Sequence, residues 1–275
     1  MHPFIDFFGI NIPTYTVLFF VAIIAAWLMQ RLLSRKSPLA RQDVTLTFVI
    51  GASGGLIGAV LLRPIMHTVR IAFSWADYRH MSMAELADYA TGEIVFFGGL
   101  LGGLLAVVLF CRKFNIDLVR LFDIFAPSLA LAHAIGRMGC FFAGCCYGMA
   151  VSEGHPLGVI YPEDAMFRAL RDGVPRLPTQ LFESMFLLVL CAVMVFLFLV
   201  QKKRGLPSAT YFFAYPVWRF FLEFFRADPT RGRYGAFTTS QYISIGLVIF
   251  AVCYVIFLRR NQKESVQGSG ADQIE

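Results

Sequence analysis

The chain has 275 residues, of which 57% are apolar and 15% are charged, and its mean hydropathy is +0.65. Soluble globular proteins carry about 25% charged residues, so this composition excludes an ordinary soluble domain and indicates an integral membrane protein. The net charge of +6 comes from the loops between apolar segments, and no basic helix with interleaved aromatic residues is present. The charge therefore does not predict a nucleic-acid partner.

Apolar segments long enough to cross a bilayer, at about 20 residues each, are spread along the whole chain. They lie at 13–33, 44–63, 94–111, 119–138, 179–200, 208–225 and 239–258. Because backbone polar groups find no water at that depth, we expect each segment to be helical. The sequence therefore predicts an all-α integral membrane protein with about seven transmembrane helices.

The loops predict how the chain is oriented. Lysine and arginine are concentrated in alternate loops, at 31–41, 112–120, 202–204 and 259–263, whereas 64–93 and 140–178 are nearly balanced in charge. The positive-inside rule then places the N-terminus outside and the C-terminus in the cytoplasm. The opening MHPFIDFFGI lacks a positive region, so we expect the first segment to be a retained span and not a signal peptide.

Two loop regions complete the predicted domain organisation. The connection at about 140–178 is long and rich in glycine, proline and charge, which predicts a small extracytoplasmic cap. Residues 263–275 are polar and contain glycine, which predicts a disordered cytoplasmic tail. We therefore expect a single transmembrane catalytic domain over 1–262.

Glycines in the second and third segments recur at intervals of four residues. Small residues at this spacing let two helices approach closely, so they predict packing faces. The pairs are Gly51/Gly55, Gly54/Gly58, Gly98/Gly102 and Gly99/Gly103.

The stretch HAIGRMGCFFAGCCYG, at 133–148, contains several residues with charged, titratable or nucleophilic side chains. On a helix, His133, Arg137 and Cys140 share one face because they lie at i, i+4 and i+7. An arginine near lipid depth either snorkels to the headgroups beside packing glycines or pairs with an anionic group. The stretch alone supports both interpretations.

The sixth segment, YPVWRFFLEFFRADP, carries a second set of charges. Arg219 and Glu223 lie at i and i+4, and Arg226 follows one turn later. Such a pair can be structural, but an ionisable residue inside a membrane is by default a functional hypothesis. Arginines on two helices suit a phosphate, because the guanidinium fork matches phosphate oxygens. In a bilayer this predicts a phospholipid headgroup as the ligand.

The motifs GRMGCFFAGCCYG, PTQLFES and RFFLEFFRADP together resemble the prolipoprotein diacylglyceryl transferase family. IPTYTVLFF, FFGGLLGG and SQYISIG extend the resemblance from about Ile12 to the last segment. The resemblance implies a multi-pass enzyme of the bacterial inner membrane that needs no cofactor. It would transfer a diacylglyceryl group from phosphatidylglycerol to the lipobox cysteine, next to the signal peptide of a prolipoprotein. A thioether forms in this first step of lipoprotein maturation.

The resemblance also implies site residues. Arg137 and Arg219 match the family's arginines and are the expected catalytic residues. The expected substrate-binding residues are Tyr15, Gly139, Gly148, Gln180, Glu183, Glu223 and Arg226.

The chain differs from the family pattern at several positions. Cys140 replaces an asparagine, Ala143 and Cys145 replace an N-x-E pair, and Phe97 replaces the histidine of H-G-G. His133 is then the nearest titratable candidate for a general base. Two alternatives stay open: His133 makes a structural contact, or the arginines lower the pKa of the acceptor thiol and no base is needed.

Cys140, Cys145 and Cys146 allow a further interpretation, because thiolates can bind zinc. Their C-x4-C-C spacing lacks the usual C-x2-C hairpin, so we predict no metal and prefer a disulfide from Cys140 to Cys145 or Cys146. The alternative functions are a cysteine-based metal or redox protein, or a lipid-binding or transport protein of the same fold without catalysis.

Overall fold

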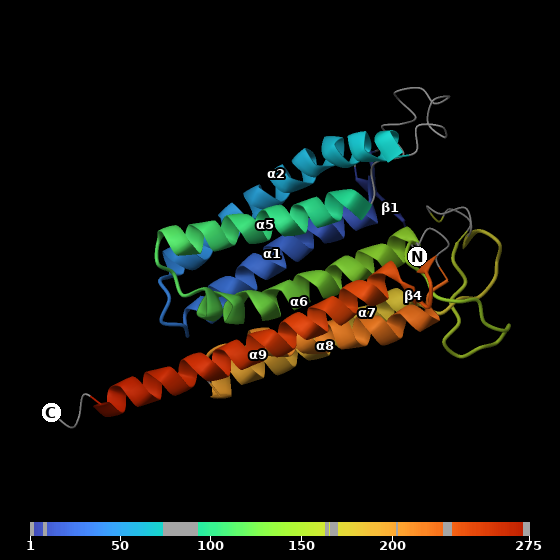
Figure 1. The fold of residues 1–275 in the computed structure, drawn as a ribbon. Coiled ribbons are helices and arrows are strands. Elements are labelled where there is room, and N and C mark those ends of the chain that lie inside the picture. The colour runs from blue at the N-terminus through green and yellow to red at the C-terminus, as the bar shows by residue number, and fades with distance from the viewer. Residues whose placement is uncertain are drawn as a thin grey trace. The chain divides into compact units, whose positions relative to one another are not determined.

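The computed structural model describes residues 3–7, 10–73, 93–162, 165, 170–201, 203–227 and 233–271. Long helices occupy every segment predicted to be apolar and helical (Figure 1). Their bounds are α1 Thr14–Ser34, α2 Arg41–Phe73, α5 Glu93–Lys113, α6 Leu118–Ala143, α7 Thr179–Phe196, α8 Leu206–Leu222 and α9 Thr239–Ala271.

Five stretches of these helices are long and apolar enough to cross a membrane. They are Thr14–Ser34, Arg41–Leu62, Leu118–Ala143, Thr179–Gln201 and Thr239–Arg260. The fold is therefore that of a mostly helical membrane protein, as predicted. The count of seven spans stays a prediction, because within the described residues α5 and α8 are not among these stretches.

The chain divides into two compact units, and the single catalytic domain expected over 1–262 stays a prediction. The first unit contains Met1–Leu33 and Phe122–Glu275, and the second contains Ser34–Leu121. Each unit is described separately below.

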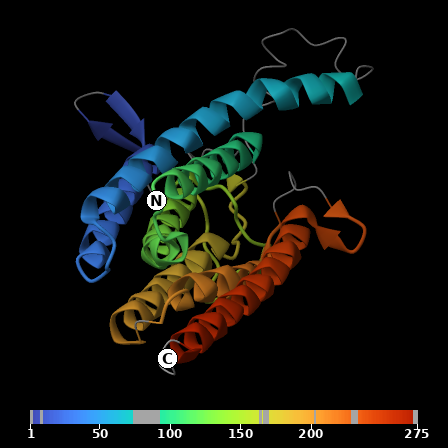
Figure 2. The same cartoon turned by 60° about the vertical axis from the view of Figure 1, so that its left-hand side comes forward.

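In the second unit, α2 and α5 lie side by side (Figure 2), and their glycines form the contact between them. A Cβ atom added to Gly103 would lie 2.9 Å from the Gly51 carbonyl oxygen. A Cβ atom added to Gly102 would lie 2.8 Å from Gly58 Cα. Neither distance leaves room for a side chain, so a larger residue would force the helices apart. The predicted packing faces are confirmed.

The first unit is built on the packing of α6, α7 and α8. Its buried core combines small residues of α6, such as Ala130 and Ala134, with larger ones such as Leu187 and Met194 of α7 and Tyr211 of α8. The small side chains bring the helices close, because little volume separates the backbones.

At the end of the bundle away from the 144–178 segment, buried Asp123 of α6 caps the N-terminus of α8. Its carboxylate accepts hydrogen bonds from the Gly205 amide at 2.6 Å and from the Ser208 hydroxyl at 2.7 Å. A carboxylate at this position satisfies donors that the first turn of a helix leaves unpaired. Gly205 has φ +82°, a conformation that glycine adopts without strain. Asp123 thus fixes the start of the helix that carries Arg219.

Element ends differ from the sequence expectations in several places. Strands β1 (Phe4–Phe7) and β2 (Ile10–Pro13) form an antiparallel hairpin before α1 that was not predicted. Helix α6 continues to Ala143, past the predicted end at residue 138, because the apolar run CFFA extends it. Helix α9 continues to Ala271, through most of the predicted disordered tail. Polar residues there, such as Gln262 and Glu264, are good helix formers, so a long helix propagates into them.

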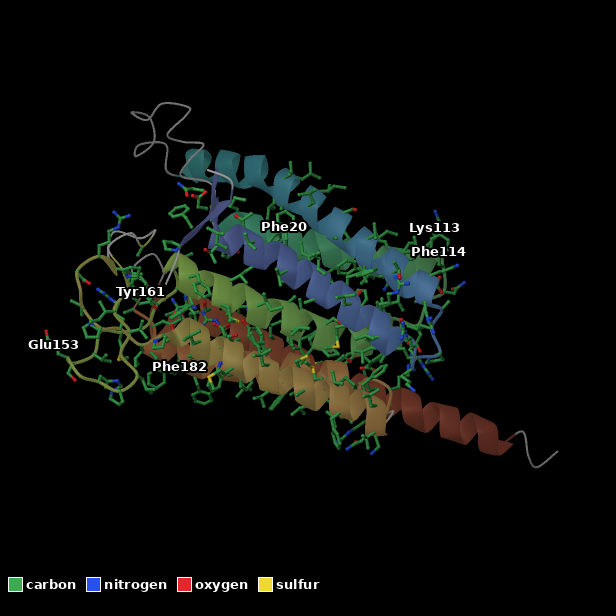
Figure 3. All side chains as sticks on the ribbon, turned by 180° about the vertical axis from the view of Figure 1, so that it is seen from behind. Phe20, Lys113, Phe114, Glu153, Tyr161 and Phe182 are labelled. Atoms are coloured by element: carbon green, nitrogen blue, oxygen red, sulfur yellow. The ribbon has the colours of Figure 1, made fainter. Side chains whose placement is uncertain are left out.

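The segment 144–178 folds on itself where α6 ends and α7 begins. Tyr147, Tyr161, Ala165 and Leu170 form a small buried cluster in it. Tyr161 lies next to the helix ends, whereas Glu153 lies at the outer tip of the loop (Figure 3). This segment corresponds to the predicted cap, and its position outside the membrane stays a prediction. Of the charge-balanced stretch 64–93, residues 74–92 fall outside the described residues.

Candidate functional site

The functional candidates of the first unit meet where α6, α7 and α8 approach the 144–178 segment. Arg137 of α6 faces Glu183 of α7, with Arg137 Nε 3.0 Å from Glu183 Oε2. The two side chains are 16% and 1% exposed. A buried carboxylate needs such a partner, since isolated charges are strongly disfavoured away from water.

The other oxygen of Glu183 is held by α8 and α6. Tyr215 donates its hydroxyl to Glu183 Oε1 at 3.0 Å. His133 Nε2 lies 3.8 Å from the same oxygen, and the His133 ring packs edge-on against Tyr215 with 4.9 Å between ring centroids. Glu183 is therefore fixed by groups from two neighbouring helices. His133 lies in this cluster, as the i, i+4 spacing with Arg137 predicted.

Arg219 and Glu223 form a second buried pair near the C-terminal end of α8. Arg219 Nη2 lies 2.7 Å from Glu223 Oε2 and donates to Ser240 Oγ of α9 at 3.3 Å. Thr238 donates its hydroxyl to Glu223 Oε1 at 3.0 Å. Arg219 Nη1 is buried and has no hydrogen-bond partner among the described residues. One donor of this arginine is thus available for a ligand.

The charges of both pairs belong to one electrostatic cluster. The Glu183 carboxylate interacts with the charges of Arg137, Arg219 and Arg226. Among the described residues, Arg137 and Arg219 lie against Glu183 and Glu223, and Arg226 also acts on Glu183. Positive charge gathered in a largely buried site attracts an anion, because screening by water is weak there.

The structure also brings Tyr15 to this end of the bundle. A Cβ atom added to Gly139 would lie 3.1 Å from Tyr15 Cδ2, so the tyrosine ring packs on the glycine. Tyr15 interacts electrostatically with Arg137 and with Cys140. Tyr15 of α1 therefore lies beside the 133–148 stretch.

Gly148 and Gln180 lie in packing contacts between the loop and α7. A Cβ atom on Gly148 would lie 2.6 Å from the Leu177 carbonyl oxygen, so the glycine permits close backbone approach. Gln180 donates to the Cys145 carbonyl at 2.7 Å and bonds to the Tyr161 hydroxyl. Burial raises the pKa of Tyr161 to about 12. These contacts anchor residues 145–148, and binding of substrate by Gly148 and Gln180 stays a prediction.

Arg226 follows the 3-10 turn Glu223–Phe225 and pairs with Gly148 in an isolated antiparallel bridge. The Met149 amide donates to the Phe225 carbonyl at 2.8 Å, which extends this contact. The end of α8 is therefore tied to the loop after α6, and the two arginine-bearing helices are held together.

Cys140, Cys145 and Cys146 have their sulfur atoms within 4.8 Å of one another. All are free thiols, so the disulfide preferred from the sequence is not present. Hydrogen bonds from Cys140 and Cys145 lower the pKa of the Cys146 thiol. The loop reaches this arrangement through positive φ angles, +71° at Gly144 and 62° at Cys146.

Several residues that contact the arginine–carboxylate pairs were not predicted from the sequence. Tyr215 shares a face of α8 with Arg219 and Glu223, because the three lie four residues apart in succession, and this spacing was a usable signal. Ser240 and Thr238 gave no comparable signal. Phe97, expected where the family has a histidine, lies in α5 of the other unit, and its side chain is outside the described residues.

Comparison with known proteins adds independent support for the family. A sequence model described as prolipoprotein diacylglyceryl transferase matches residues 3–257. The phosphatidylglycerol–prolipoprotein diacylglyceryl transferase of Clostridium tetani is 29% identical over 259 residues, which cover 94% of this chain and 98% of the relative. The enzyme of the same name numbered 2 from Clostridium perfringens is 31% identical, with 94% and 96% covered. The chain belongs to the prolipoprotein diacylglyceryl transferase family.

Proposed function

We propose that this protein is a transferase that moves a diacylglyceryl group from phosphatidylglycerol to the lipobox cysteine of prolipoproteins. The activity follows the names of relatives that match along nearly the whole chain. The observation that carries the site assignment is the buried arginine cluster, in which Arg219 Nη1 has no hydrogen-bond partner among the described residues. A donor in this state suits a ligand oxygen, because an unmade buried hydrogen bond is costly.

The protein acts in the bacterial inner membrane in this proposal. Seven helices span it, with the N-terminus outside and the C-terminus in the cytoplasm, as the positive-inside rule predicts. The 144–178 segment then forms the extracytoplasmic cap. The arginine cluster beside that segment would face the outer leaflet, where both substrates can reach it.

Arg137 and Arg219 are the proposed phosphate-binding and catalytic residues. Glu183 and Glu223 hold the two guanidinium groups in place and should not themselves contact the phosphate, because like charges repel. The two guanidinium groups stabilise the negative charge that develops on the leaving phosphate. Such preorganised donors contribute about 3 to 4 kcal/mol each in a site shielded from water.

The reaction exchanges one carbon–oxygen bond for one carbon–sulfur bond. The acceptor sulfur attacks the diacylglyceryl carbon that carries the phosphate ester, and the bond from that carbon to the phosphate oxygen breaks. The bond's electron pair leaves on glycerol phosphate, and the thiol gives up its proton to solvent or a base. Because thiolate is the nucleophilic form, any group that favours it accelerates the step.

His133 is the candidate general base, and its contacts favour a positioning role. Its Nε2 atom faces Glu183 Oε1 at 3.8 Å and its ring packs on Tyr215. A loss of activity in His133→Gln that is confined to neutral pH and recovers at high pH would identify a base. A loss by the same factor at every pH is the result expected from positioning.

Tyr15, Gly139, Gly148, Gln180 and Arg226 are the further proposed substrate-binding residues. Arg226 adds positive charge next to the loop, and Tyr15 packs on Gly139 beside Arg137. These residues bind the parts of the lipid and of the peptide that flank the phosphate. Gln180 and Gly148 would act by shaping the loop that they anchor.

The test is transfer in a purified system. Protein in detergent is incubated with phosphatidylglycerol and a lipobox peptide, and the peptide mass is measured. We expect a gain of one diacylglyceryl group on the cysteine peptide and none on a matched peptide with serine in its place. Absence of product from protein that is folded and monodisperse would overturn the proposed activity.

A further inference from the structure

The cluster of three cysteines at the end of α6 has the composition and spacing of a metal site. The sulfur atoms of Cys140, Cys145 and Cys146 lie within 4.8 Å of one another. Sulfurs bound to one zinc ion through bonds of about 2.3 Å lie about 3.8 Å apart in a tetrahedral site. The observed cluster therefore needs to contract by only about 1 Å. We propose that these cysteines bind a thiophilic metal ion, with Zn²⁺ as the expected occupant.

The sequence argued against this site because C-x4-C-C is not a hairpin spacing. The fold removes that objection. Helix α6 contributes Cys140 from its last turn, and the chain then reverses through Gly144 at φ +71°. Cys146 adopts φ 62°, which is rare for a residue other than glycine, and this places adjacent cysteines in one cluster.

Surrounding contacts hold the backbone of the two loop cysteines. Gln180 donates to the Cys145 carbonyl at 2.7 Å, and Thr179 donates to the Cys146 carbonyl at 3.0 Å. The Cys145 amide donates to the Cys140 carbonyl at 3.0 Å. Ligands held by a second layer of hydrogen bonds lose little freedom on binding a metal, which favours a built site over a chance cluster.

The site lies beside the arginine cluster. Arg137 interacts electrostatically with Cys140 and Cys146, and Arg226 interacts with Cys146. Three thiolates and Zn²⁺ carry a net charge of −1, and positive charge nearby favours such a group. Among the described residues the group contains three protein ligands and no fourth. Three protein ligands with an open position are typical of catalytic zinc, whereas structural zinc has four.

The open position suggests a role that rests on the proposed transfer activity. The acceptor cysteine would enter as a fourth ligand, displacing water, and its proton would leave to solvent. A coordinated thiol is deprotonated outright and is a competent nucleophile. After attack, the carbon–sulfur bond has formed and glycerol phosphate has left. The thioether product is a poorer ligand, so water replaces it.

Metal content tests the site independently of activity. The full-length protein is purified with reductant, supplied with Zn²⁺, desalted and analysed for zinc per chain. We expect about one zinc in the wild type and in the control Cys253→Ser, whose cysteine lies outside the cluster. Cys140→Ser, Cys145→Ser and Cys146→Ser should each lose at least 80% of it. Zinc below 0.2 per wild-type chain, or binding that the three variants retain, would overturn the site.

Loading the wild-type protein with Co²⁺ tests whether the acceptor cysteine binds at the metal site. This experiment needs no cysteine variant, so it does not depend on whether the variants fold. Co²⁺-loaded wild type should absorb in the near ultraviolet as thiolate-to-cobalt charge transfer. Adding the lipobox peptide should increase this absorption by about one third, because a fourth thiolate joins three, whereas the serine peptide should leave it unchanged. Identical spectra with both peptides would overturn the acceptor role. Failure of the proposed function would give a different result, which is the absence of diacylglyceryl product from zinc-loaded enzyme.

Discussion

Two arginine–carboxylate pairs in this protein have the same length and the same sequence spacing but lie in different surroundings. Arg219 Nη2 is 2.7 Å from Glu223 Oε2, and Arg176 Nη2 is 2.7 Å from Asp172 Oδ2, with the partners at i and i+4 in both pairs. The Glu223 side chain is 2% exposed, whereas the Asp172 side chain is 43% exposed. Thr238 and Ser240 surround the first pair, while the second lies on the surface of the 144–178 segment.

This difference decides what each pair can do. Around Asp172 water and salt screen the charges, so the pair contributes little to stability and exerts little force on a ligand. Around Glu223 screening is weak, and an arginine with an unused donor acts strongly on a nearby anion. The distance between two charges therefore does not single out a candidate site, whereas burial together with an unpaired donor does.

The largest effect is expected from removing either buried arginine. Arg137→Ala and Arg219→Ala should each lower transfer by at least about 1,000-fold, equivalent to about 4 kcal/mol of transition-state stabilisation. Lysine should restore little, because a point charge does not replace the guanidinium fork. The measurement is the rate of diacylglyceryl peptide formation. Arg120→Ala, an exposed arginine, is the matched control, and near-normal rates in either buried variant would contradict the phosphate assignment.

A smaller loss is expected when the buried carboxylate is neutralised. Glu223→Gln keeps the shape and leaves Arg219 charged, so transfer should fall by about 30-fold, or about 2 kcal/mol. The comparison is made as kcat/KM at equal levels of folded protein. A larger loss than in Arg219→Ala would mean that the carboxylate itself takes part in the chemistry.

Loss of one hydrogen bond to Glu183 should be smaller again. Tyr215→Phe removes the 3.0 Å bond to Glu183 Oε1 and leaves the Arg137 pair intact. A hydrogen bond to a charged group contributes about 1.5 kcal/mol or somewhat more, so thermal stability should fall measurably while transfer persists. Thermal unfolding in detergent is the readout, with Tyr242→Phe as the exposed control. An unchanged midpoint would show that Glu183 does not depend on this contact.

The smallest effect is expected at the Arg176–Asp172 pair, whose carboxylate is exposed. The hydrogen bond from Arg176 lowers the pKa of Asp172, so any stabilisation is present above the unfolded-state pKa and is lost as pH falls through the folded-state pKa. Asp172→Asn should therefore leave transfer unchanged, and any difference in unfolding midpoint at pH 7 should shrink below about pH 4. A strong loss of transfer at pH 7 would give this surface pair a role that its exposure argues against.

Much of the fold followed from the sequence because apolar length and glycine spacing are strong local signals. The helix segments and the α2–α5 glycine faces were both predicted. The β1–β2 hairpin was missed because it is short and apolar like the helix that follows it. The predicted C-terminal ends of α6 and α9 lie before the observed ones, because glycines and polar residues do not stop a helix that is already formed.

The sequence predicted the site's arginines and the Arg219–Glu223 pair, but not the contacts of Tyr215, Thr238 and Ser240. Arg137 and Arg219 stand out because charge is rare in such segments, but the pairing of Arg137 with Glu183 joins residues of different helices. The cysteine cluster was even harder to predict from the sequence. Its spacing argued against a metal, and only the reversal at Gly144 and the φ angle of Cys146 bring the sulfurs together.

Lipid binding without an acceptor peptide shows whether the buried arginines hold the lipid phosphate. Native mass spectrometry can compare phosphatidylglycerol with neutral diacylglycerol on the wild type, on Arg219→Ala and on the control Asp172→Asn. We expect the wild type and the control to prefer phosphatidylglycerol, and Arg219→Ala to lose at least about 10-fold of this preference, or about 1.4 kcal/mol. An unchanged preference in a folded Arg219→Ala protein would show that Arg219 does not hold the phosphate.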